Sequence, residues 1–299
     1  MAHVRIGSRG SDLALWQANH VKRQLEDLGC TVDITIIKTQ GDAIQHLSFD
    51  KLEGKGFFTK EIEQALLEET IDLAVHSHKD LETNPPAGLK IAAVSEREDP
   101  ADLLLISRSA VQSGEVWNLK EGAVVGTSSA RRKSQVLRFR DDVTIKDLRG
   151  NVPTRIQKLR EGHYDAILLA KAGVDRLQID LSEFEVVRLD PTEFVPAPAQ
   201  GVLALQIREN DAQTEEIVSK INHGDVHERI AVERKVLNLL QGGCQLPLGV
   251  FCSEEKVVYV SHADSWENGS NWYTYEAEGL DGLAELIVAD LQESTEELD

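Results

Sequence analysis

The 299-residue sequence has few cysteines, few aromatic residues and no long hydrophobic run. Its three cysteines, Cys30, Cys244 and Cys252, are widely spaced and odd in number, which excludes a disulfide framework. No segment approaches the roughly 18 consecutive apolar residues of a membrane span. The first residues lack the charged head, apolar stretch and small-residue cleavage site of an export signal. We therefore predict a cytoplasmic protein without a membrane partner.

Positive charge is also scarce, because 32 lysines and arginines stand against 51 acids, giving a formal net charge of −19. This balance disfavours a nucleic-acid partner, since non-specific binding depends on cations that face phosphates. Between Arg131 and Arg160, however, ten lysines and arginines accompany only three aspartates. Such a run is either a solvated basic face or a polyanion site. We favour the polyanion site because its charge opposes that of the rest of the chain.

Hydrophobic periodicity predicts alternating strands and helices. The first part has strands at 3–8, 31–39 and 71–77 and helices at 12–29 and 59–69. In the first helix Ala14, Ala18, Val21, Leu25 and Leu28 form one apolar stripe, and Gly29 is expected to end it. This rhythm is typical of a mainly parallel sheet covered by helices.

The same rhythm restarts near residue 100 and then changes. The second part has strands at 103–107, 123–127, 144–148 and 164–170, and helices at 130–139 and 153–162. The Pro-rich segment 190–201 is predicted to cross between domains, and the strand 202–207 to return to the first sheet. A helix near 226–241, three strand-like segments and a final helix predict a small antiparallel α+β domain.

Polar residues cluster where the strand 71–77 ends. His76, Ser77, His78, Lys79 and Asp80 follow one another there, and ligands of open α/β sheets collect at such strand ends. The two histidines raise the question of a metal, but no other His or Cys cluster has ligand spacing, so we predict none. The residues are either ordinary strand-end polar groups or a site with Lys79 as an anion contact and Asp80 as a carboxylate for a cation or a proton.

The segment GTSSARRKS joins a strand to a helix. Thr127, Ser128 and Ser129 offer hydroxyl and backbone N–H groups at a helix N-terminus, where the dipole favours anions. Capping explains Ser129 alone. Arg131 and Arg132 lie in the first helical turn, an unfavourable place for cations unless they have acidic partners. The segment therefore indicates an anion site.

Three further arginines occupy similar positions. Arg149 closes a strand, Arg155 lies in the first turn of the next helix, and Arg9 follows the first strand. Planar guanidinium groups on fixed elements suit bidentate binding of carboxylates. We therefore expect carboxylates to be bound at these strand ends.

Cys244 differs from the other two cysteines because it follows Gly242 and Gly243 at the end of a predicted helix. Cys30 and Cys252 lie beside or within strands and are expected to be buried. The two glycines are expected to end the helix and to leave the Cys244 thiol accessible on a loop. Such a thiol is a nucleophile, a redox sensor or a covalent tether.

A series of motifs then resembles the hydroxymethylbilane synthase family, also called porphobilinogen deaminase. In order along the chain they are VRIGSRGSDLALWQA, GKGFFTKEIEQALLE, DLAVHSHKDL, EREDPAD, VVGTSSARR, DLRGNVPTR, YDAILLAKAGVDRL, PAPAQGVLALQIRE and QGGCQLPLG. They cover residues 4 to about 250. The last motif has Gln241 where the family commonly has glutamate.

The resemblance implies an α/β fold with two type II periplasmic-binding-protein-like domains flanking a cleft and a small C-terminal α+β domain. The boundaries are expected at 1–98 with 200–221, 99–199 and 222–299. It further implies that four porphobilinogens are condensed head to tail, with release of ammonia and, by hydrolysis, of linear hydroxymethylbilane. The implied cofactor is a dipyrromethane held by a thioether at Cys244. A monomer that hands its product to the next tetrapyrrole-pathway enzyme is also expected.

By the same match, Asp80 is the catalytic carboxylate that stabilises the cation formed when ammonia leaves. The residues expected to bind the cofactor are Cys244, Ser77, Lys79, Thr127, Ser128, Ser129, Arg131, Arg132, Arg149 and Arg155. The residues expected to bind the substrate are Arg9, Ser11, Gln17, Arg149, Arg155 and Arg176. Every pyrrole carries two carboxylates, which suits the cationic run 131–160.

Two other classes of protein compete with this interpretation. A non-catalytic two-domain anion receptor would use its arginines only to hold a ligand. A nucleic-acid binder is disfavoured by the net charge and by the lack of aromatic residues within the basic run.

Overall fold

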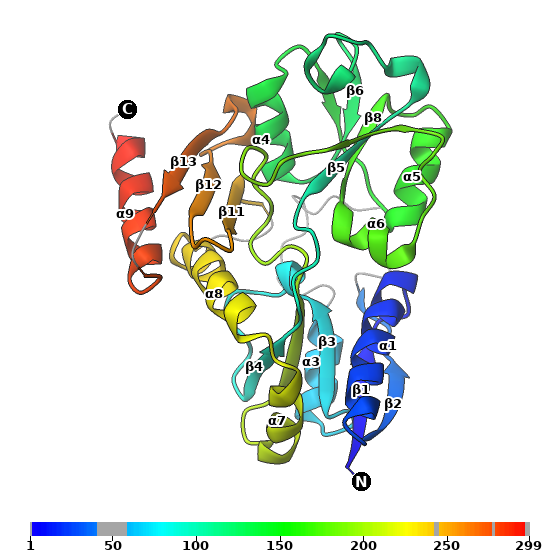
Figure 1. Cartoon of the computed structure of the whole chain (residues 1–299), viewed down its shortest axis with the longest axis vertical. Coiled ribbons are helices and arrows are strands. Elements are labelled where there is room, and N and C mark those ends of the chain that lie inside the picture. The colour runs from blue at the N-terminus through cyan, green and yellow to red at the C-terminus, as the bar shows by residue number, and fades with distance from the viewer. Residues whose placement is uncertain (1, 41–58, 242–244, 277–278, 297–299) are drawn as a thin grey trace. The chain divides into compact units, whose positions relative to one another are not determined.

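The computed structural model describes residues 2–40, 59–241, 245–276 and 279–296. The chain separates into two compact units, Met1–Glu98 with Gln200–Glu228 and Asp99–Ala199 with Arg229–Asp299. The described residues contain three sheets, one in the first unit and two in the second (Figure 1). The predicted α/β class with a small C-terminal α+β part is confirmed. The division into three domains at residues 98, 199 and 221 stays a prediction.

The first sheet has the order β2-β1-β3-β10-β4. Its strands are β1 (His3–Ser8), β2 (Thr31–Ile36), β3 (Leu73–Ser77), β4 (Leu89–Val94) and β10 (Leu203–Arg208). The strand β1 is parallel to β2 and β3, whereas β10 is antiparallel to β3 and β4. The predicted return of residues 202–207 to this sheet is therefore confirmed.

Helices cover both faces of the first sheet. One face packs on α1 (Asp12–Asp27) in a core that includes Val4, Val21 and Leu205. The other face packs on α3 (Lys60–Leu67), which contributes Ile62 and Leu66. The remaining elements of this unit are η2 (His78–Asp80), α7 (Ala212–Val218) and η5 (Ser219–Ile221).

The first helix follows its predicted boundaries closely. Ser11 caps α1 by accepting a hydrogen bond from the Ala14 N–H at 3.4 Å, and Gly29 adopts a φ of +85° just after the helix. Val21 and Leu25 of the predicted stripe are buried, but Leu28 is 45% exposed. The prediction for Leu28 is wrong because the helix ends at Asp27, so Leu28 no longer faces the core.

The second sheet has the order β7-β6-β8-β5-β9. Its strands are β5 (Asp102–Ile106), β6 (Val124–Gly126), β7 (Thr144–Lys146), β8 (Ala166–Ala170) and β9 (Glu185–Arg188). Its helical elements are α4 (Ala130–Phe139), α5 (Val152–Arg160), α6 (Lys171–Leu177), η3 (Arg108–Ala110) and η4 (Val116–Asn118). Here β6 is parallel to β7 and β8, and β5 is antiparallel to β8 and β9. The two five-stranded sheets thus share one topology.

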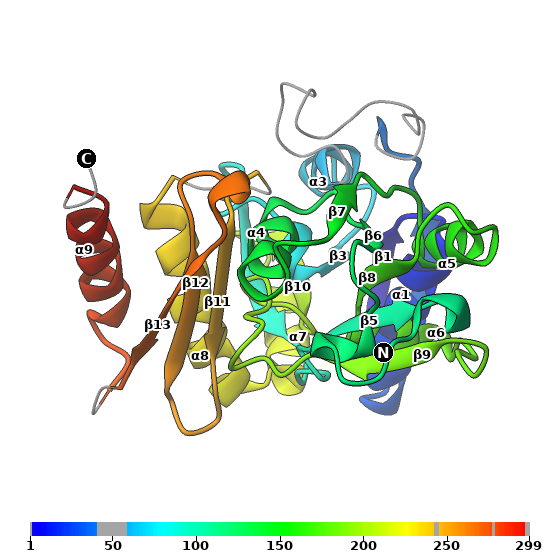
Figure 2. The ribbon, with the colours of Figure 1, turned by 90° about the horizontal axis from the view of Figure 1, so that it is seen from above.

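The third sheet, β11-β12-β13, is antiparallel. The elements of this region are α8 (Gly224–Leu239), β11 (Leu248–Cys252), β12 (Val258–His262), η6 (Trp266–Asn268), β13 (Asn271–Tyr275) and α9 (Leu283–Glu296). Val236 of α8 and Ile287 of α9 share a core with β11 and β12, and α4 contacts the same two strands (Figure 2). Cys252 is fully buried in that core, as predicted, whereas Cys30 is half-buried.

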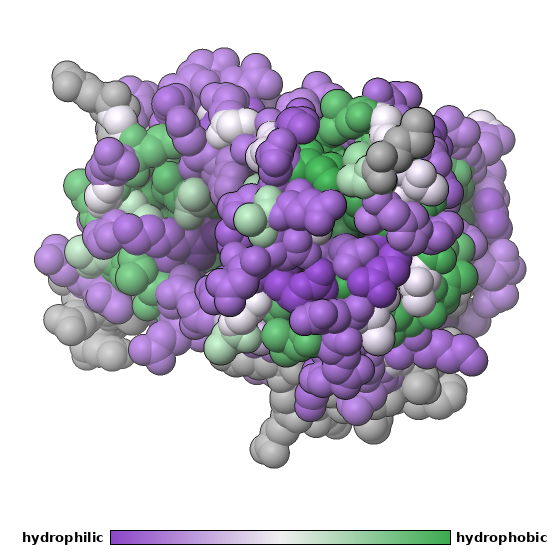
Figure 3. Space-filling view, turned by 90° about the horizontal axis from the view of Figure 1, so that it is seen from below, coloured by the Kyte–Doolittle hydropathy of each residue, from purple (hydrophilic) through white to green (hydrophobic). Residues whose placement is uncertain are grey.

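The face of the molecule in Figure 3 is mainly hydrophilic, with hydrophobic side chains in separate patches. Exposed large apolar residues such as Ile36 and Leu286 are scattered over different elements, which is normal for a protein surface. In the part of the chain that the structure describes, no helix is both long and apolar enough to cross a membrane.

Candidate functional site

Most of the candidate residues of the first unit lie at one edge of the first sheet. Arg9 and Ser11 follow β1, and Lys79 and Asp80 follow β3. Because β1 and β3 are parallel neighbours, their carboxyl ends meet at the same edge. The structure therefore brings together residues that are about 70 positions apart in the sequence.

Two hydrogen bonds fix the end of β3. Gln17, a buried residue of α1, donates from Nε2 to Ser77 Oγ at 2.8 Å. Lys79 donates from Nζ to Gln200 Oε1 at 3.2 Å. Asp80 ends the short helix η2 and is exposed, so its carboxylate is accessible from solvent. The candidate residues Gln17 and Ser77 thus lie beside the short turn that contains Lys79 and presents Asp80.

The two histidines beside this turn are both buried. The His76 ring lies on β3 with Nε2 at 3.1 Å from Gln206 Oε1. Burial lowers the pKa of His76 to about 4, the Gln206 hydrogen bond opposes this shift and the Arg9 charge adds to it. Among the residues that the structure describes, no group of three His, Cys, Asp or Glu side chains is placed to bind a metal.

The candidate residues of the second unit lie at the corresponding edge of the second sheet. Thr127, Ser128 and Ser129 follow β6, and Arg149 follows its parallel neighbour β7. Ser128 Oγ donates to the Leu148 carbonyl at 3.1 Å and accepts from the Leu148 N–H at 3.0 Å, which joins the two strand ends. Ser129 caps α4 through the Arg132 N–H at 3.4 Å.

Arg131 and Arg132 have the acidic partner that their position in the first turn of α4 requires. Asp102, at the start of β5, lies 2.8 Å from Arg131 Nη1 and 2.7 Å from Arg132 Nη2. All three side chains are buried. Burial alone raises the pKa of a carboxyl, but the two guanidinium groups hold the pKa of Asp102 well below its usual range. Sequence reasoning missed Asp102, although the two unexplained arginines were a signal for a buried acid.

Several cations of the basic run pair with acids of the protein. The pairs are Arg131 and Arg132 with Asp102, Lys133 with Asp147, Arg140 with Asp142, and Arg160 with Glu183. Part of the run therefore serves the fold of the second unit, a use that the sequence indicated only for Arg131 and Arg132. Arg149 and Arg155 are half-buried at the strand edge, and Arg155 Nε donates to the Gly150 carbonyl at 2.7 Å. Arg176 is buried on α6.

The predicted tether Cys244 lies outside the described residues, as do Gly242 and Gly243. The helix before them, α8, ends at Leu239, and Gln241 already adopts a left-handed φ of +52°. The Gln241 N–H donates to the Asn238 carbonyl at 2.8 Å. The prediction that the glycines end this helix is therefore wrong, because the chain leaves the helical path before it reaches them.

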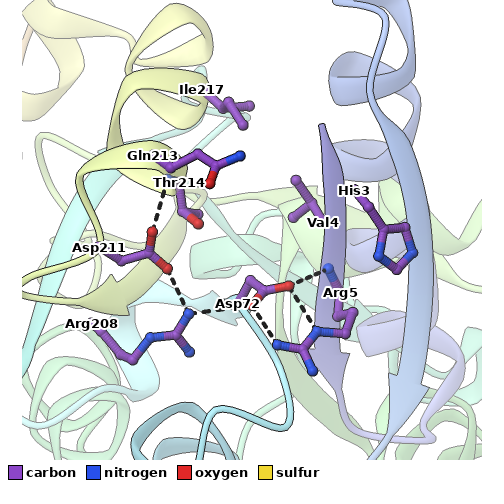
Figure 4. A pocket seen from close by; sticks show the side chains of 9 residues that line it. All are labelled: His3, Val4, Arg5, Asp72, Arg208, Asp211, Gln213, Thr214 and Ile217. Atoms are coloured by element: carbon purple, nitrogen blue, oxygen red, sulfur yellow. Dashed lines mark hydrogen bonds and ion pairs between the residues drawn. The ribbon is translucent and has the colours of Figure 1, made fainter. Parts of the chain in front are cut away.

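A different polar cluster occupies the opposite edge of the first sheet, where a cavity of about 410 Å³ is present (Figure 4). Asp72 lies 2.6 Å from Arg5 Nη2 and 3.2 Å from Arg208 Nη2, and Asp211 lies 2.5 Å from Arg208 Nη2. Although burial raises it, hydrogen bonds from the two arginines lower the pKa of Asp72 to about 2. Two arginines and two aspartates balance in charge, so this cluster stabilises the fold.

The family model and the curated relatives that match this chain carry the same name. Residues 4–216 match the family described as "Porphobilinogen deaminase, dipyromethane cofactor binding domain". The porphobilinogen deaminase of Syntrophobacter fumaroxidans is 43% identical over 251 residues, which are 82% of this chain and 78% of that protein. That of Sulfurimonas denitrificans is 45% identical over 257 residues, covering 85% and 80% of the two chains.

Comparison with solved structures gives matches at low sequence identity. An ancestral arginine-binding protein bound to arginine has a TM-score of 0.40 at 15% identity, with 74% of this chain and 91% of that chain covered. The periplasmic VFT2 domain of Bordetella pertussis BvgS has a TM-score of 0.43 at 12% identity, with 74% and 86% covered.

Fold and strand-end residues together define an α/β protein with two sheets of shared topology and polar, partly cationic groups at their carboxyl edges. The match of residues 4–216 to the family model and the identity to curated relatives identify one family within this class. The chain belongs to the porphobilinogen deaminase family.

Proposed function

We propose that this protein condenses four porphobilinogen molecules head to tail on a dipyrromethane cofactor and releases linear hydroxymethylbilane by hydrolysis. The family match over residues 4–216 supports this reaction. The observation that carries it in the structure is the exposed Asp80 at the carboxyl end of β3, beside Lys79 and the Gln17–Ser77 hydrogen bond.

The residues at the carboxyl edge of the second sheet fit a cofactor that carries carboxylates. Hydroxyl groups of Thr127, Ser128 and Ser129 and the guanidinium groups of Arg149 and Arg155 follow two parallel strands there. Charge-assisted hydrogen bonds from such groups are short and strong. When bound, the dipyrromethane supplies the pyrrole carbon to which the first substrate is joined, and Cys244 is the proposed point of attachment. Arg131 and Arg132 are proposed to contribute through the charge left over from their pairing with Asp102.

Asp80 is the proposed catalytic residue. Each addition breaks the C–N bond of an aminomethyl group, so that ammonia leaves and positive charge develops on the substrate. The Asp80 carboxylate is proposed to stabilise that charge. A C–C bond then forms, and the attacked ring carbon loses its proton, for which Asp80 is the proposed acceptor. Arg9, Ser11, Gln17 and Arg176 are proposed to hold the incoming substrate, together with Arg149 and Arg155.

The direct test uses the purified protein and porphobilinogen. We expect ammonia release and, after acid quench, a series of protein masses that differ by one added pyrrole unit. Asp80→Asn keeps the shape of the side chain but removes its charge, so turnover is expected to fall at least about 100-fold while the cofactor remains bound. Asp141→Asn, at an exposed acid with no assigned role, serves as the control and should react normally. Near-normal turnover of Asp80→Asn would remove this residue from the mechanism.

The alternative, a non-catalytic anion receptor, makes the opposite prediction for the same experiment. It would bind porphobilinogen or another carboxylate without releasing ammonia and without a covalent series of masses. We further propose a cytoplasmic monomer that passes its product to the next tetrapyrrole-pathway enzyme. Sedimentation at a mass of 33.1 kDa for the bare chain, plus the cofactor, tests the monomer.

A further inference from the structure

Polar side chains form a hydrogen-bonded series behind the turn that presents Asp80; His76, Gln206 and Thr59 are buried, and Glu63 is half-buried. His76 on β3, Gln206 on β10 and Glu63 on α3 come from three elements of the first unit. His76 Nε2 lies 3.1 Å from Gln206 Oε1, and Gln206 Nε2 lies 3.1 Å from Glu63 Oε1. Thr59 Oγ1 lies 3.3 Å from Glu63 Oε2 and continues the chain to the start of α3. Gln206 and His76 are only 1% and 6% exposed.

The chemistry of these groups determines which one donates and which one accepts in each hydrogen bond of the series. An ionised carboxylate can only accept hydrogen bonds, so Glu63 requires the NH₂ group of the Gln206 amide. The amide oxygen then faces His76, and it can accept only if the ring carries its proton on Nε2. A neutral ring with Nε2–H satisfies every partner along this path. The low pKa of His76 agrees with this arrangement.

The hydrogen-bonded side chains lie next to the turn that presents Asp80. His76 pairs with Ala204 of β10 in the antiparallel ladder, and the His78 N–H donates to the Val202 carbonyl at 2.9 Å. Along β3, Ser77 faces α1 and is held by Gln17, whereas His76 faces the opposite side of the sheet. The strand end that leads into η2 is therefore held from both faces of the sheet.

We propose that His76 and Gln206 are positioning residues for the condensation, and that the path from Glu63 through Gln206 to a neutral His76 holds the Asp80 turn in place. The expected effect on kcat rests on the proposed function, whereas the hydrogen-bonded path and the neutral His76 ring do not. The Gln17–Ser77 contact explains one face of the strand end only. The path through Gln206 supplies the second restraint.

The structural part is tested by ¹⁵N NMR of the holoenzyme labelled at histidine, with His76→Asn used to assign the His76 signals. Between pH 5.5 and 7.5 we expect a neutral ring protonated on Nε2. A ring protonated on Nδ1, or on both nitrogens, would overturn the proposal. This outcome is read without any turnover, so it stays separate from a failure of the proposed function.

The kinetic part compares Gln206→Met with the neighbouring core variant Ile207→Val. Gln206→Met keeps the length of the side chain but removes both hydrogen bonds, and we expect kcat per cofactor-loaded enzyme to fall about tenfold with little change in KM. Ile207 faces the core on the other side of the sheet, so Ile207→Val should keep the wild-type kcat. A wild-type kcat for Gln206→Met, or an equal fall in Ile207→Val, would contradict positioning.

If Gln206→Met does not fold, Gln206→Glu tests both the structural and the kinetic part of the proposal. The variant places a second carboxylate between Glu63 and the ring of His76. Negative charge beside the ring favours its protonated form, so His76 should take up a proton at a higher pH than in the wild type. We expect the His76 signals to titrate at higher pH and the acid limb of the kcat profile to shift in the same direction. Unchanged signals and an unchanged profile would refute the path.

Discussion

At the scale of single residues, Asp102 explains two arginines that the sequence left without a reason. Its carboxylate accepts a hydrogen bond from Arg132 Nη2 and forms an ion pair with Arg131 Nη1, which supplies the countercharge that two buried cations need at a helix N-terminus. Arg131 Nη1 also donates to the Val195 carbonyl at 2.9 Å, and Arg132 Nη1 to the Leu168 carbonyl at 3.2 Å. One acid thus joins β5, β8 and α4.

Asp102→Asn is expected to destabilise the protein strongly, because it leaves two buried guanidinium groups without a countercharge. The expected loss is about 3–5 kcal/mol in the free energy of unfolding, measured by urea denaturation. Glu183→Gln removes the acid of an exposed pair with Arg160 and should cost less than about 1 kcal/mol. Similar losses for both variants would show that Asp102 does not have this role.

His76 makes the stability depend on pH. Its pKa in the folded protein is about 4, against 6.5 ordinarily, so below pH 6.5 the unfolded chain binds a proton that the folded chain does not. Stability contributed by the neutral ring should therefore decrease as the pH falls from 6.5 to 4, by about 3 kcal/mol in total. Burial shifts the pKa of His262 in the same direction. His76→Asn should remove much of this slope in urea titrations, and an unchanged slope would contradict the assignment.

The candidate residues could be predicted from the sequence where they belong to a local motif, and not where a partner comes from far along the chain. Asp80, Lys79 and the Thr127–Ser129 segment end strands whose apolar runs are visible in the sequence. Asp102 is 30 residues from Arg132, and Gln206 is 130 residues from His76. The two first-turn arginines signal a buried acid but not which one, and nothing local signals Gln206, because the sheet topology creates both contacts.

At the scale of elements, long periodic segments were predicted well, whereas two of the edge strands were missed. The helix predicted at 130–139 matches α4, and the strand predicted at 202–207 is β10 within one residue. The edge strands β4 and β9 were not predicted. β9 is short and alternates only weakly, and β4 follows a turn-rich segment, so neither has a strong periodic signal.

Gly201, just before β10, is expected to tolerate no side chain. It has a φ of +90°, and a Cβ atom there would lie 2.4 Å from the Glu98 carbonyl oxygen. Gly201→Ala should therefore cost both the left-handed strain and the displacement of backbone, together about 2–4 kcal/mol. Gly29 is the matched control, because its φ is +85° and nothing lies within 4 Å of a Cβ there. Gly29→Ala should lower the thermal midpoint less than Gly201→Ala, and equal shifts would refute the steric argument.

At the scale of the whole molecule, two sheets of one topology each end in a polar edge, within a chain of net charge −19. The sequence predicted the concentration of cations at residues 131–160 but not that several of them neutralise acids of the second unit. In our account the remaining cations serve a product that carries many carboxylates and stays attached to the enzyme while it grows. Covalent attachment is therefore the central claim.

The most direct test of that claim is the intact mass of the purified protein, followed by peptide mapping of the segment that contains Cys244. We predict a chain heavier than its sequence by one dipyrromethane, with the added mass on the Cys244 sulfur and absent from Cys244→Ser. A chain of unmodified mass, whose Cys244 thiol is alkylated quantitatively and which still condenses porphobilinogen, would contradict the account.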